Sequence, residues 1–405
     1  MPSTLPDGEP VPADGALPDV VRSRIGARRF SFYVHVPYCA SRCGYCDFNT
    51  YTAAELGGGA SQASYARDAI AEIELARTVL GAPDLLVNTV FFGGGTPTML
   101  ETDDLATMLR AIDEWFGLAA DAEVTIEANP ESVDRYSLTS LRAAGFNRIS
   151  FGMQSARPHV LHVLDRKHTP GVPEQRVAEA KAAGFDHVNL DLIYGTPGES
   201  DDDWRASLDA AIAAEPDHIS AYSLIVEDGT ALARRIARGE LAAPDDDVLA
   251  DRYLIADEML AAAGFGWYEV SNWARPGGEC RHNLAYWRGD DWWGIGPGAH
   301  SHIGGVRWWN VKHPTAYARR LSDGESPGLA REVLDAETTR VERVLLRLRL
   351  VEGLDLAVLD DVGRKAVGRE VDAGLLDPVA AREGRAVLTL AGRLLADAVV
   401  RRLLG

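Results

Sequence analysis

Short apolar stretches alternate with amphipathic stretches along most of the chain. Between the apolar stretches, hydrophobic residues recur at helical spacing, as in Tyr65–Leu80, and Thr102-Asp103-Asp104 predicts a helix start ahead of Leu105–Phe116. Strands that alternate with helices favour an α/β fold with a parallel, barrel-like sheet, here a partial (β/α)6 barrel. Six stretches predict its strands: Phe30–Val36, Val87–Phe92, Glu123–Glu127, Arg148–Met153, His187–Tyr194 and His218–Ile225.

A repeated tetrad supports this reading. Ala-Ala-Gly-Phe occurs at 143–146, 182–185 and 262–265. In each copy the glycine stands where a helix ends in a left-handed residue, and the phenylalanine begins the next apolar strand. The three copies of the tetrad therefore predict repeated β–α units. In barrels of this kind the functional residues gather at the carboxyl ends of the strands.

The length of 405 residues predicts two or three domains. Residues 1–28 are rich in Pro, Asp, Gly and Ala and predict a disordered leader without an export signal. The barrel is expected over 29–245. A segment rich in Trp and His follows at 246–330, and a small helical domain at 331–405.

Composition excludes several classes of function. Hydrophobic residues make up 46% of the chain, but no run reaches the roughly 18 apolar residues that a membrane span needs. Free cysteines without an export signal predict a cytoplasmic, reducing environment. The net charge is −19, from 41 basic and 60 acidic residues, which disfavours a nucleic acid partner.

Three of the four cysteines lie within eight residues, as Cys39-x3-Cys43-x2-Cys46. A disulfide framework would not crowd three thiols in this way. Zinc is the alternative, although a closed zinc site needs four ligands. A [4Fe-4S] cluster held by three cysteines leaves one iron open, and that iron can bind S-adenosylmethionine. The spacing resembles that of radical S-adenosylmethionine (radical SAM) enzymes.

Polar residues mark the predicted strand ends. The second strand runs into Gly93-Gly94-Gly95-Thr96, and Glu127, Gln154 and Asp191 end later strands. Three glycines allow close approach of a ligand to the backbone, although a tight turn has the same composition. The three polar side chains suit a zwitterionic ligand with a ribose, or hydrogen bonds between strands. Arg166 is a candidate carboxylate ligand or a charge on a surface helix.

The order of these motifs resembles the oxygen-independent coproporphyrinogen III oxidase family. The motifs are Tyr33 before the cysteines, Tyr45 between them, Gly-Gly-Gly-Thr-Pro-Thr, Glu-Ala-Asn-Pro, Gly-Met-Gln-Ser and Asp-Leu-Ile-Tyr-Gly. The resemblance implies that Tyr33, Gly94, Glu127 and the cluster contact one S-adenosylmethionine. It implies second-molecule positions at Tyr45, Gly95, Thr96, Gln154, Arg166, Asp191 and Ile225.

Two departures from the oxidase favour a different branch. The oxidase carries a further cysteine where this chain has Phe48, and its N-terminal segment is ordered. Both features resemble the HemW branch of haem chaperones. That resemblance implies a protein that binds a cluster, S-adenosylmethionine and haem and delivers haem to acceptor apoproteins. It is also compatible with a homodimer and with peripheral membrane association. The alternative is the oxidase itself, which decarboxylates coproporphyrinogen III to protoporphyrinogen IX.

Seven of the nine tryptophans lie between Trp267 and Trp309, together with Cys280, His282, His300 and His302. Aromatic faces and imidazoles suit haem, and a tryptophan wall that closes the barrel is the alternative. The motif His282-Asn283-x-x-Tyr286-Trp287 resembles a signature of the haem-chaperone branch. It makes His282 the candidate haem contact, whereas Cys280 is expected to be a buried thiol.

The last part of the chain predicts helices over 339–350 and Leu394–Leu404, with a β-like stretch at Ala386–Leu390. This pattern resembles the winged-helix-like C-terminal domain of the same family. Because a fold does not carry a function by itself, a packing domain or a substrate cover is the reading that we adopt.

Overall fold

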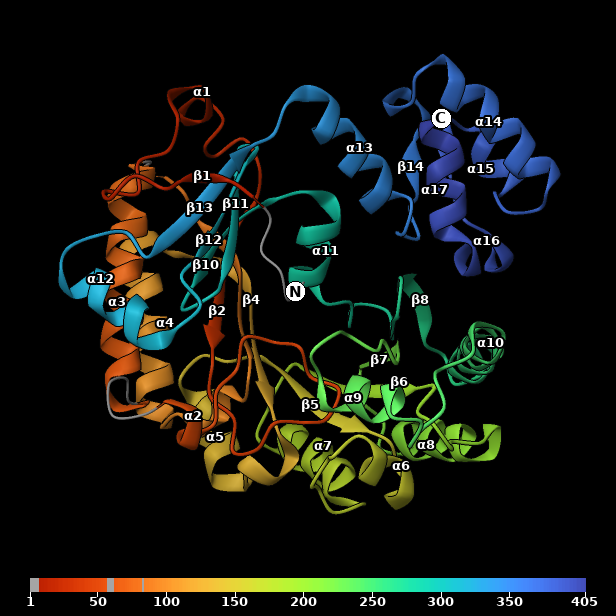
Figure 1. The fold of residues 1–405 in the computed structure, drawn as a ribbon, viewed down its shortest axis with the longest axis horizontal. Coiled ribbons are helices and arrows are strands. Elements are labelled where there is room, and N and C mark those ends of the chain that lie inside the picture. The colour runs from red at the N-terminus through yellow and green to blue at the C-terminus, as the bar shows by residue number, and fades with distance from the viewer. Residues whose placement is uncertain (1–6, 57–61, 82–83) are drawn as a thin grey trace.

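The computed structural model describes residues 7–56, 62–81 and 84–405. Across these residues one mixed sheet runs in the order β1-β13-β12-β11-β10-β2-β3-β4-β5-β6-β7-β9-β8 (Figure 1). Its central six strands are parallel, which confirms the α/β class and the partial (β/α)6 barrel. They are β2 (Phe30–Val36), β3 (Val87–Gly94), β4 (Leu118–Ala128), β5 (Arg148–Gln154), β6 (His187–Tyr194) and β7 (His218–Ser223).

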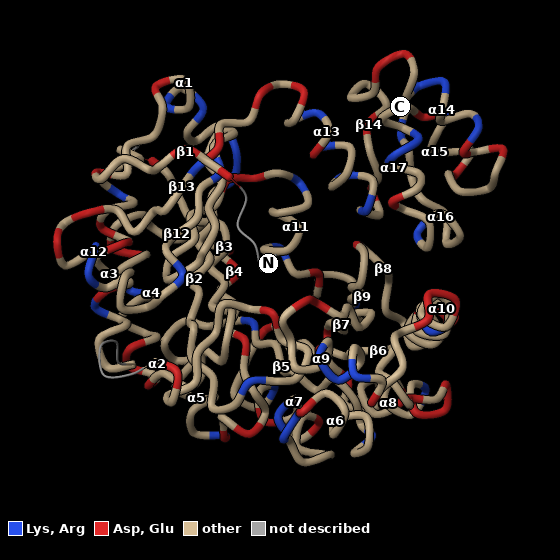
Figure 2. Tube along the Cα trace, viewed as in Figure 1, with Lys and Arg blue, Asp and Glu red and all other residues tan. Residues whose placement is uncertain are grey.

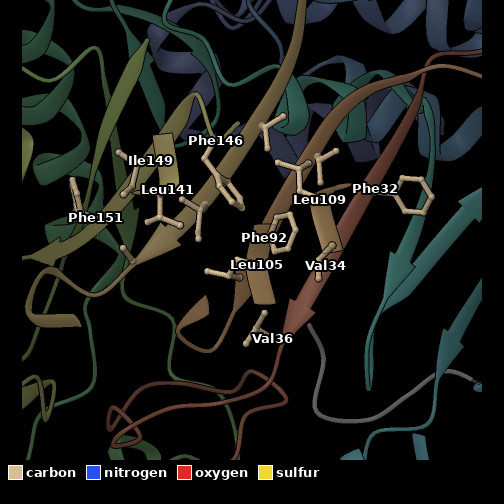
Figure 3. Close-up of a cluster of buried hydrophobic side chains, with 14 of the residues drawn as sticks. Phe32, Val34, Val36, Phe92, Leu105, Leu109, Leu141, Phe146, Ile149 and Phe151 are labelled. Atoms are coloured by element: carbon tan, nitrogen blue, oxygen red, sulfur yellow. The ribbon is translucent and has the colours of Figure 1, made fainter. Parts of the chain in front are cut away.

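Helices cover the outer face of these strands (Figure 1). The longer ones are α3 (Gln62–Leu80), α4 (Thr102–Phe116), α5 (Arg135–Ala143), α7 (Val172–Ala182), α8 (Asp201–Ala213) and α10 (Asp246–Ala262). Shorter turns are α2 (Ala53–Leu56), η1 (Pro97–Met99), η2 (Pro130–Ser132), α6 (Pro158–Val163) and α9 (Ala231–Ala237). Figure 3 shows Val34 and Phe92 beside Leu105 and Leu109 of α4 in the buried layer. Alternate residues of β2, including Tyr33, consequently face the barrel interior.

The repeated tetrads behave as the sequence predicts. Gly145, Gly184 and Gly264 follow the ends of α5, α7 and α10 with φ of 109°, 89° and 84°. The phenylalanines that follow them are buried under the sheet. A left-handed residue that only glycine adopts without strain therefore ends each of these three helices.

The predicted disordered leader is wrong from residue 7 onward. Strand β1 (Glu9–Pro10) pairs with β13, and the short helix α1 (Asp19–Arg22) follows. Leu17 and Val21 are 7% and 1% exposed. The amino-acid composition of this segment does not reveal that Leu17 and Val21 are buried. It also does not reveal that the edge strand β13 offers β1 its backbone hydrogen-bond partners. Residues 1–6 lie outside the described residues.

The Trp- and His-rich segment extends the same sheet at both of its edges. Strands β8 (Gly266–Glu269) and β9 (Asn272–Ala274) continue the sheet beyond β7 in antiparallel pairing. The chain then crosses through α11 (Arg281–Arg288), and β10 (Asp291–Ile295) pairs in parallel with β2. Next come β11 (His300–Ile303), β12 (Val306–Asn310), α12 (Pro314–Ser322) and β13 (Gly328–Val333). The boundary expected at 330/331 therefore falls inside β13.

A small helical unit closes the chain. It contains α13 (Ala336–Arg347), η3 (Leu356–Val358), α14 (Asp361–Asp372), α15 (Pro378–Arg382), α16 (Leu390–Leu394) and α17 (Ala396–Leu404), with the strand pair β14 (Leu354–Asp355) and β15 (Arg385–Ala386). Val344, Leu376 and Val399 belong to a hydrophobic core of its own. Helix α13 lies between the β10–β13 end of the sheet and the remaining C-terminal helices (Figure 1).

In the described part of the chain, no helix combines the length and the apolar character that crossing a membrane requires. Acidic and basic positions are interspersed over most elements (Figure 2). The 60 acidic and 41 basic residues are thus spread along the whole chain and are not confined to one segment.

Candidate functional site

A cavity of about 450 Å³ lies at the carboxyl ends of the parallel strands. It brings together all of the predicted site residues except Tyr33, His282 and Ile225. The predicted residues among those that line it are Cys39, Cys43, Tyr45, Cys46, Gly94, Gly95, Thr96, Glu127, Gln154, Arg166 and Asp191. Residues from five strands and the loops that follow them therefore converge, as the barrel topology requires.

The cysteine loop follows β2 and is held by backbone hydrogen bonds from several elements. The amide of Cys39 donates to the carbonyl of Tyr51 at 3.1 Å, and the amide of Cys46 donates to that of Cys43 at 3.2 Å. Gly44 donates to Leu164 at 3.0 Å and accepts from Leu232 at 2.8 Å. The loop is thereby fixed to α6 and α9, with its three thiols on the cavity side.

An arginine contacts one of the three thiols, and burial disfavours the thiolate form of the other two. Nη1 of Arg166 donates to Sγ of Cys43 at 3.4 Å. Burial raises the pKa of Cys39, and it raises the pKa of Cys46 to about 11. The thiols of Cys39 and Cys46 therefore hold their protons near pH 7, and binding of a metal would release them.

Within the described ranges, no three His, Cys, Asp or Glu side chains converge on a single metal ion. The ligands of an iron–sulfur cluster bind different irons of one cube, so their sulfur atoms stand further apart than those around a single zinc ion. The three thiols line one cavity, as the ligands of a single cluster would.

The glycine turn after β3 is required by close approach. A Cβ on Gly94, whose φ is 107°, would lie 2.5 Å from Nδ1 of His35. A Cβ on Gly95 would lie 2.5 Å from the carbonyl oxygen of Tyr38 and 3.0 Å from Sγ of Cys39. Any side chain at these positions would displace β2 or the cysteine loop. The turn is therefore part of the thiol site, and not only a bend in the chain.

Two buried carboxyl groups face the same cavity. Burial, with a smaller contribution from nearby Asp191, raises the pKa of Glu127 to about 8, while the Gly94 amide 3.2 Å from its Oε2 opposes the shift. Burial also raises the pKa of Asp191, which accepts hydrogen bonds from Ser150 at 2.7 Å and Asn189 at 2.8 Å. A cationic ligand would stabilise both carboxylates. The sulfonium and ammonium groups of S-adenosylmethionine have that charge.

Gln154 and Arg166 form the wall next to these carboxyls. Gln154 has a φ of 63° at a register shift of β5, a left-handed conformation that costs energy for a residue other than glycine and that is common at functional sites. Arg166 donates from Nη2 to the carbonyl of Gly152 at 3.0 Å, and its buried Nε has no partner among the described residues. The alternative of a surface charge at Arg166 is therefore wrong.

At the end of β7 the structure differs from the sequence prediction: Tyr222 lines the cavity, and the predicted Ile225 does not. Ile225 is 64% exposed and does not line the cavity. Tyr222, together with Ser150 of β5, does line it. The alternation of Ser220 and Tyr222 along β7 places both on the interior face, and that period could have identified Tyr222.

A second cavity, of about 720 Å³, adjoins the first. Its walls come from β2, α11, the β10–β12 strands and α13, and Phe48 lines both cavities. The other residues that line it are Tyr33, His35, Tyr286, Gly289, Trp292, His300, His302, Arg307, Glu342, Leu345 and Leu346. Tyr33 thus stands in this cavity, apart from the cysteine site.

His282 lies behind the wall of the second cavity. It is 1% exposed, with Nδ1 2.7 Å from Oγ1 of Thr89 and Nε2 2.9 Å from the hydroxyl of Tyr286. Its ring stacks on Phe91 at 5.1 Å. Because both ring nitrogens are engaged and the residue lines neither cavity, this position does not match the predicted haem contact. The motif instead places Tyr286 on the cavity wall.

Three other histidines line the second cavity: His300, His302 and His35, whose Nδ1 lies 3.1 Å from the hydroxyl of Tyr33 and whose Nε2 lies 2.9 Å from the carbonyl oxygen of Asn49. Nδ1 of His302 lies 3.3 Å from the carbonyl oxygen of Asp290, and its ring centroid is 5.1 Å from that of Trp292. Burial lowers the pKa of both His300 and His302 to about 4, so both rings are neutral near pH 7. Most of the neighbouring tryptophans pack in the core, as the tryptophan wall predicts, whereas Trp292 lines the cavity.

The fourth cysteine lies away from the other three. Cys280 is buried at the start of α11, with Sγ 3.6 Å from Oε1 of Glu123, and burial raises its pKa. The same carboxylate accepts hydrogen bonds from the amides of Arg281 at 3.1 Å and His282 at 2.9 Å. This confirms a buried thiol at Cys280 and shows how Glu123 anchors α11.

Comparisons with known proteins agree with this geometry. The sequence model of the Radical SAM superfamily matches residues 33–211. The chain is 57% identical over 376 residues to the heme chaperone HemW of Mycobacterium tuberculosis strain H37Rv, covering 93% of this chain and 95% of that protein. It is 36% identical over 338 residues to the heme chaperone HemW of Synechocystis, covering 82% and 81% of the two chains.

The structure of the coproporphyrinogen III oxidase HemN from Escherichia coli, described as a radical SAM enzyme, shares the fold. Its TM-score is 0.81 over 95% of this chain and 92% of that chain, at 24% sequence identity. The shared fold extends beyond the parallel strands to the added segment and the C-terminal helices. Together with the HemW identities, these comparisons show that the chain belongs to the HemW family of radical SAM proteins.

Proposed function

We propose that this protein is a haem chaperone built on a radical SAM scaffold, which binds a [4Fe-4S] cluster, S-adenosylmethionine and haem and passes haem to acceptor proteins. The observation that carries the proposal is the cavity in which three thiols adjoin Glu127 and Asp191. The identity of 57% to a protein named as a heme chaperone supports the cargo.

In this proposal the cluster is held by Cys39, Cys43 and Cys46, and Arg166 stabilises the Cys43 thiolate through its 3.4 Å contact. When bound, the cluster supplies an open iron and an electron for S-adenosylmethionine. The Gly94–Gly95 turn leaves room for that ligand against the backbone. Glu127 and Asp191 offer negative charge to its cationic groups.

The second candidate function is oxidative decarboxylation of coproporphyrinogen III. It is favoured by the cavity side chains Gln154, Arg166 and Asp191, which match positions that bind a second S-adenosylmethionine in the oxidase. Phe48 argues against it, since the oxidase has a cysteine there and this aromatic ring instead lines both cavities. A protein that carries haem has no need of a second S-adenosylmethionine.

The test is one anaerobic preparation with its cluster reconstituted, divided into two assays. One half receives reductant, S-adenosylmethionine and coproporphyrinogen III, and chromatography measures protoporphyrin. The other half is titrated with haemin by absorbance and then mixed with an apo-haemoprotein. We expect stoichiometric haemin uptake, haem transfer and no protoporphyrin.

Two results would contradict the proposal. Conversion of coproporphyrinogen III would make the protein an oxidase and would show that Phe48 is tolerated in that reaction. Absence of saturable haemin uptake by protein with a full cluster would remove haem as the cargo. The E. coli oxidase, assayed in parallel, shows that the assay detects turnover.

A further inference from the structure

The second cavity has the size and composition of a site for a flat apolar ligand. Its volume of about 720 Å³ falls within the roughly 300–1,000 Å³ range of small-molecule sites. Tyr33, Tyr286 and Trp292 line it from the barrel side, and Leu345 and Leu346 line it from α13. Aromatic and aliphatic side chains of this kind bury the faces of a porphyrin ring.

Of the three histidines that line this cavity, His35 has both ring nitrogens engaged, and His302 has the geometry of an iron ligand. Its Nδ1 faces the carbonyl oxygen of Asp290 at 3.3 Å, and a hydrogen bond from Nδ1 to a carbonyl leaves the lone pair on Nε2. Among the described residues, no hydrogen bond to Nε2 of His302 is present, whereas both nitrogens of His282 are engaged. We infer that haem occupies the second cavity and that Nε2 of His302 is its axial iron ligand.

The charge at one rim of the cavity suits the two propionates of haem. Gly289 lines the cavity, and its carbonyl accepts from Nη1 of Arg28 at 2.9 Å. The basic groups around the adjacent Asp290 are Arg28, Arg29, Arg288 and Arg347. The acidic groups there are Asp290, Asp291 and Glu352, the last paired with Arg288 at 2.7 Å. Four arginines against three carboxyls place one excess positive charge beside Gly289, while the cavity-lining Arg307 is itself paired with Glu342.

The C-terminal unit supplies one wall of this site. Arg307 of β12, which lines the cavity, bonds to Glu342 of α13 and to Glu332 of β13 at 2.7 Å. Helix α13 also packs against α11, which carries Tyr286. This assigns the C-terminal unit a role as cover of the haem, and movement of α13 would open the cavity.

The inference rests on the proposed function, because it assumes that haem is the cargo. Its test compares haemin with iron-free protoporphyrin IX, which has the same ring and propionates but cannot be ligated. Both are titrated into the wild-type protein and into the His302→Ala, His300→Ala and His282→Ala variants. Affinities come from tryptophan quenching and absorbance, and the ferric spin state comes from electron paramagnetic resonance.

We expect His302→Ala to weaken haemin binding at least ten-fold, to shift the Soret band and to change the spin state. The same variant should bind protoporphyrin IX within two-fold of the wild type, because a lost ligand affects only the iron. Leu346→Trp, which fills the cavity from α13, should weaken both ligands. Arg343→Trp, on an exposed position of the same helix, is its matched control.

Each other outcome has a definite meaning. If the wild type binds no haemin, the proposed function fails. If the wild type binds haemin and His302→Ala leaves its affinity and spectrum unchanged, only this inference is overturned. Equal loss of haemin and protoporphyrin IX in His302→Ala would assign the residue to the cavity wall and reject iron ligation. A spectral change confined to His300→Ala or His282→Ala would move the ligand to that residue.

Discussion

The guanidinium of Arg166 reaches the sulfur of Cys43 across the cavity, with Nη1 3.4 Å from Sγ. Its other terminal nitrogen donates to the carbonyl of Gly152 on β5 at 3.0 Å. One side chain therefore connects the cysteine loop, which follows β2, to a strand three positions away in the sheet. The thiol at the centre of the loop is placed by the barrel as well as by the loop's own turns.

Replacement of Cys43 by Ala should prevent assembly of a complete [4Fe-4S] cluster, because two thiolates remain to hold it. Anaerobic reconstitution followed by iron and sulfide analysis, with absorbance in the violet, measures the loss. Cys280→Ala is the control, since that thiol is buried beside Glu123 and should leave cluster content unchanged. Four irons per chain in the Cys43→Ala protein would overturn the three-cysteine assignment.

Glu127 should make the ligand-free protein less stable as the pH rises. Its pKa of about 8 in the folded state exceeds the ordinary value of 4.5, so the folded state holds more protons between these values. Unfolding is then favoured by up to about 1.4 kcal/mol for each pH unit across that window. Urea unfolding of Glu127→Gln and wild type at pH 6, 7 and 8 should show the variant gaining relative stability at each step. A constant difference between the two proteins would show that Glu127 is ionised throughout.

Phe48 separates the two cavities, and its removal should affect haem more than the cluster. Its ring is 48% exposed, so truncation to Ala removes about half of the apolar contact of a phenylalanine. With full burial worth roughly 1.5–3 kcal/mol, haemin affinity should fall by about three- to ten-fold. Haemin titration of cluster-loaded protein measures this, and Phe48→Leu should retain most of the affinity. Loss of the cluster with unchanged haem affinity would contradict the shared wall.

Arg307 should slow the release of haem by holding α13 against β12. Arg307→Gln removes the ion pairs to Glu332 and Glu342, each worth up to about 1 kcal/mol because the side chains are 29–36% exposed to solvent. Haem dissociation into excess apomyoglobin should accelerate by about two- to five-fold. Arg340→Gln changes an arginine that pairs with Glu337 within α13, and it should leave the rate unchanged. Equal rates in all three proteins would indicate that α13 does not limit release.

His282→Ala should act on stability, because the imidazole lies behind the cavity wall. Loss of the imidazole removes the His282 partner of the Tyr286 hydroxyl and leaves a small void, while Thr89 keeps its 2.9 Å bond to Ser31. We expect the free energy of unfolding to fall by about 2–4 kcal/mol. Chemical denaturation measures the loss, and an unchanged ferric haem spectrum in the folded fraction separates this role from ligation.

The central strands and most of the first cavity could be predicted from local sequence. Parallel strands are apolar on both faces, so the continuous apolar runs predict the exact bounds of β2 and β6. Polar residues such as Glu127 of β4 and Asp191 of β6 are then conspicuous near the strand ends. The spacing of Cys39, Cys43 and Cys46 likewise identifies the loop residues of the site. Topology then requires that residues at the same ends of neighbouring strands meet.

The second cavity could not be predicted, because its walls meet only in the folded chain. Tyr33 and Leu346 are separated by most of the sequence, yet both line it. The histidines posed a similar difficulty. Sequence alone does not show which ring nitrogens find partners, and the motif that singled out His282 marks a residue whose two nitrogens are both engaged. Disorder at the N-terminus was mispredicted because two buried side chains, Leu17 and Val21, outweigh an unfavourable composition.

The added segment, residues 246–330, supplies the strands that pair with both outer strands of the six-stranded parallel sheet. Strand β9 covers the outer side of β7, and β10 covers the outer side of β2. A fragment that ends near residue 245 would leave both strands with unpaired amides and carbonyls, which invite edge-to-edge association of separate molecules. The six parallel strands therefore do not form a separable module, and a shortened protein should precipitate where the full chain remains monodisperse.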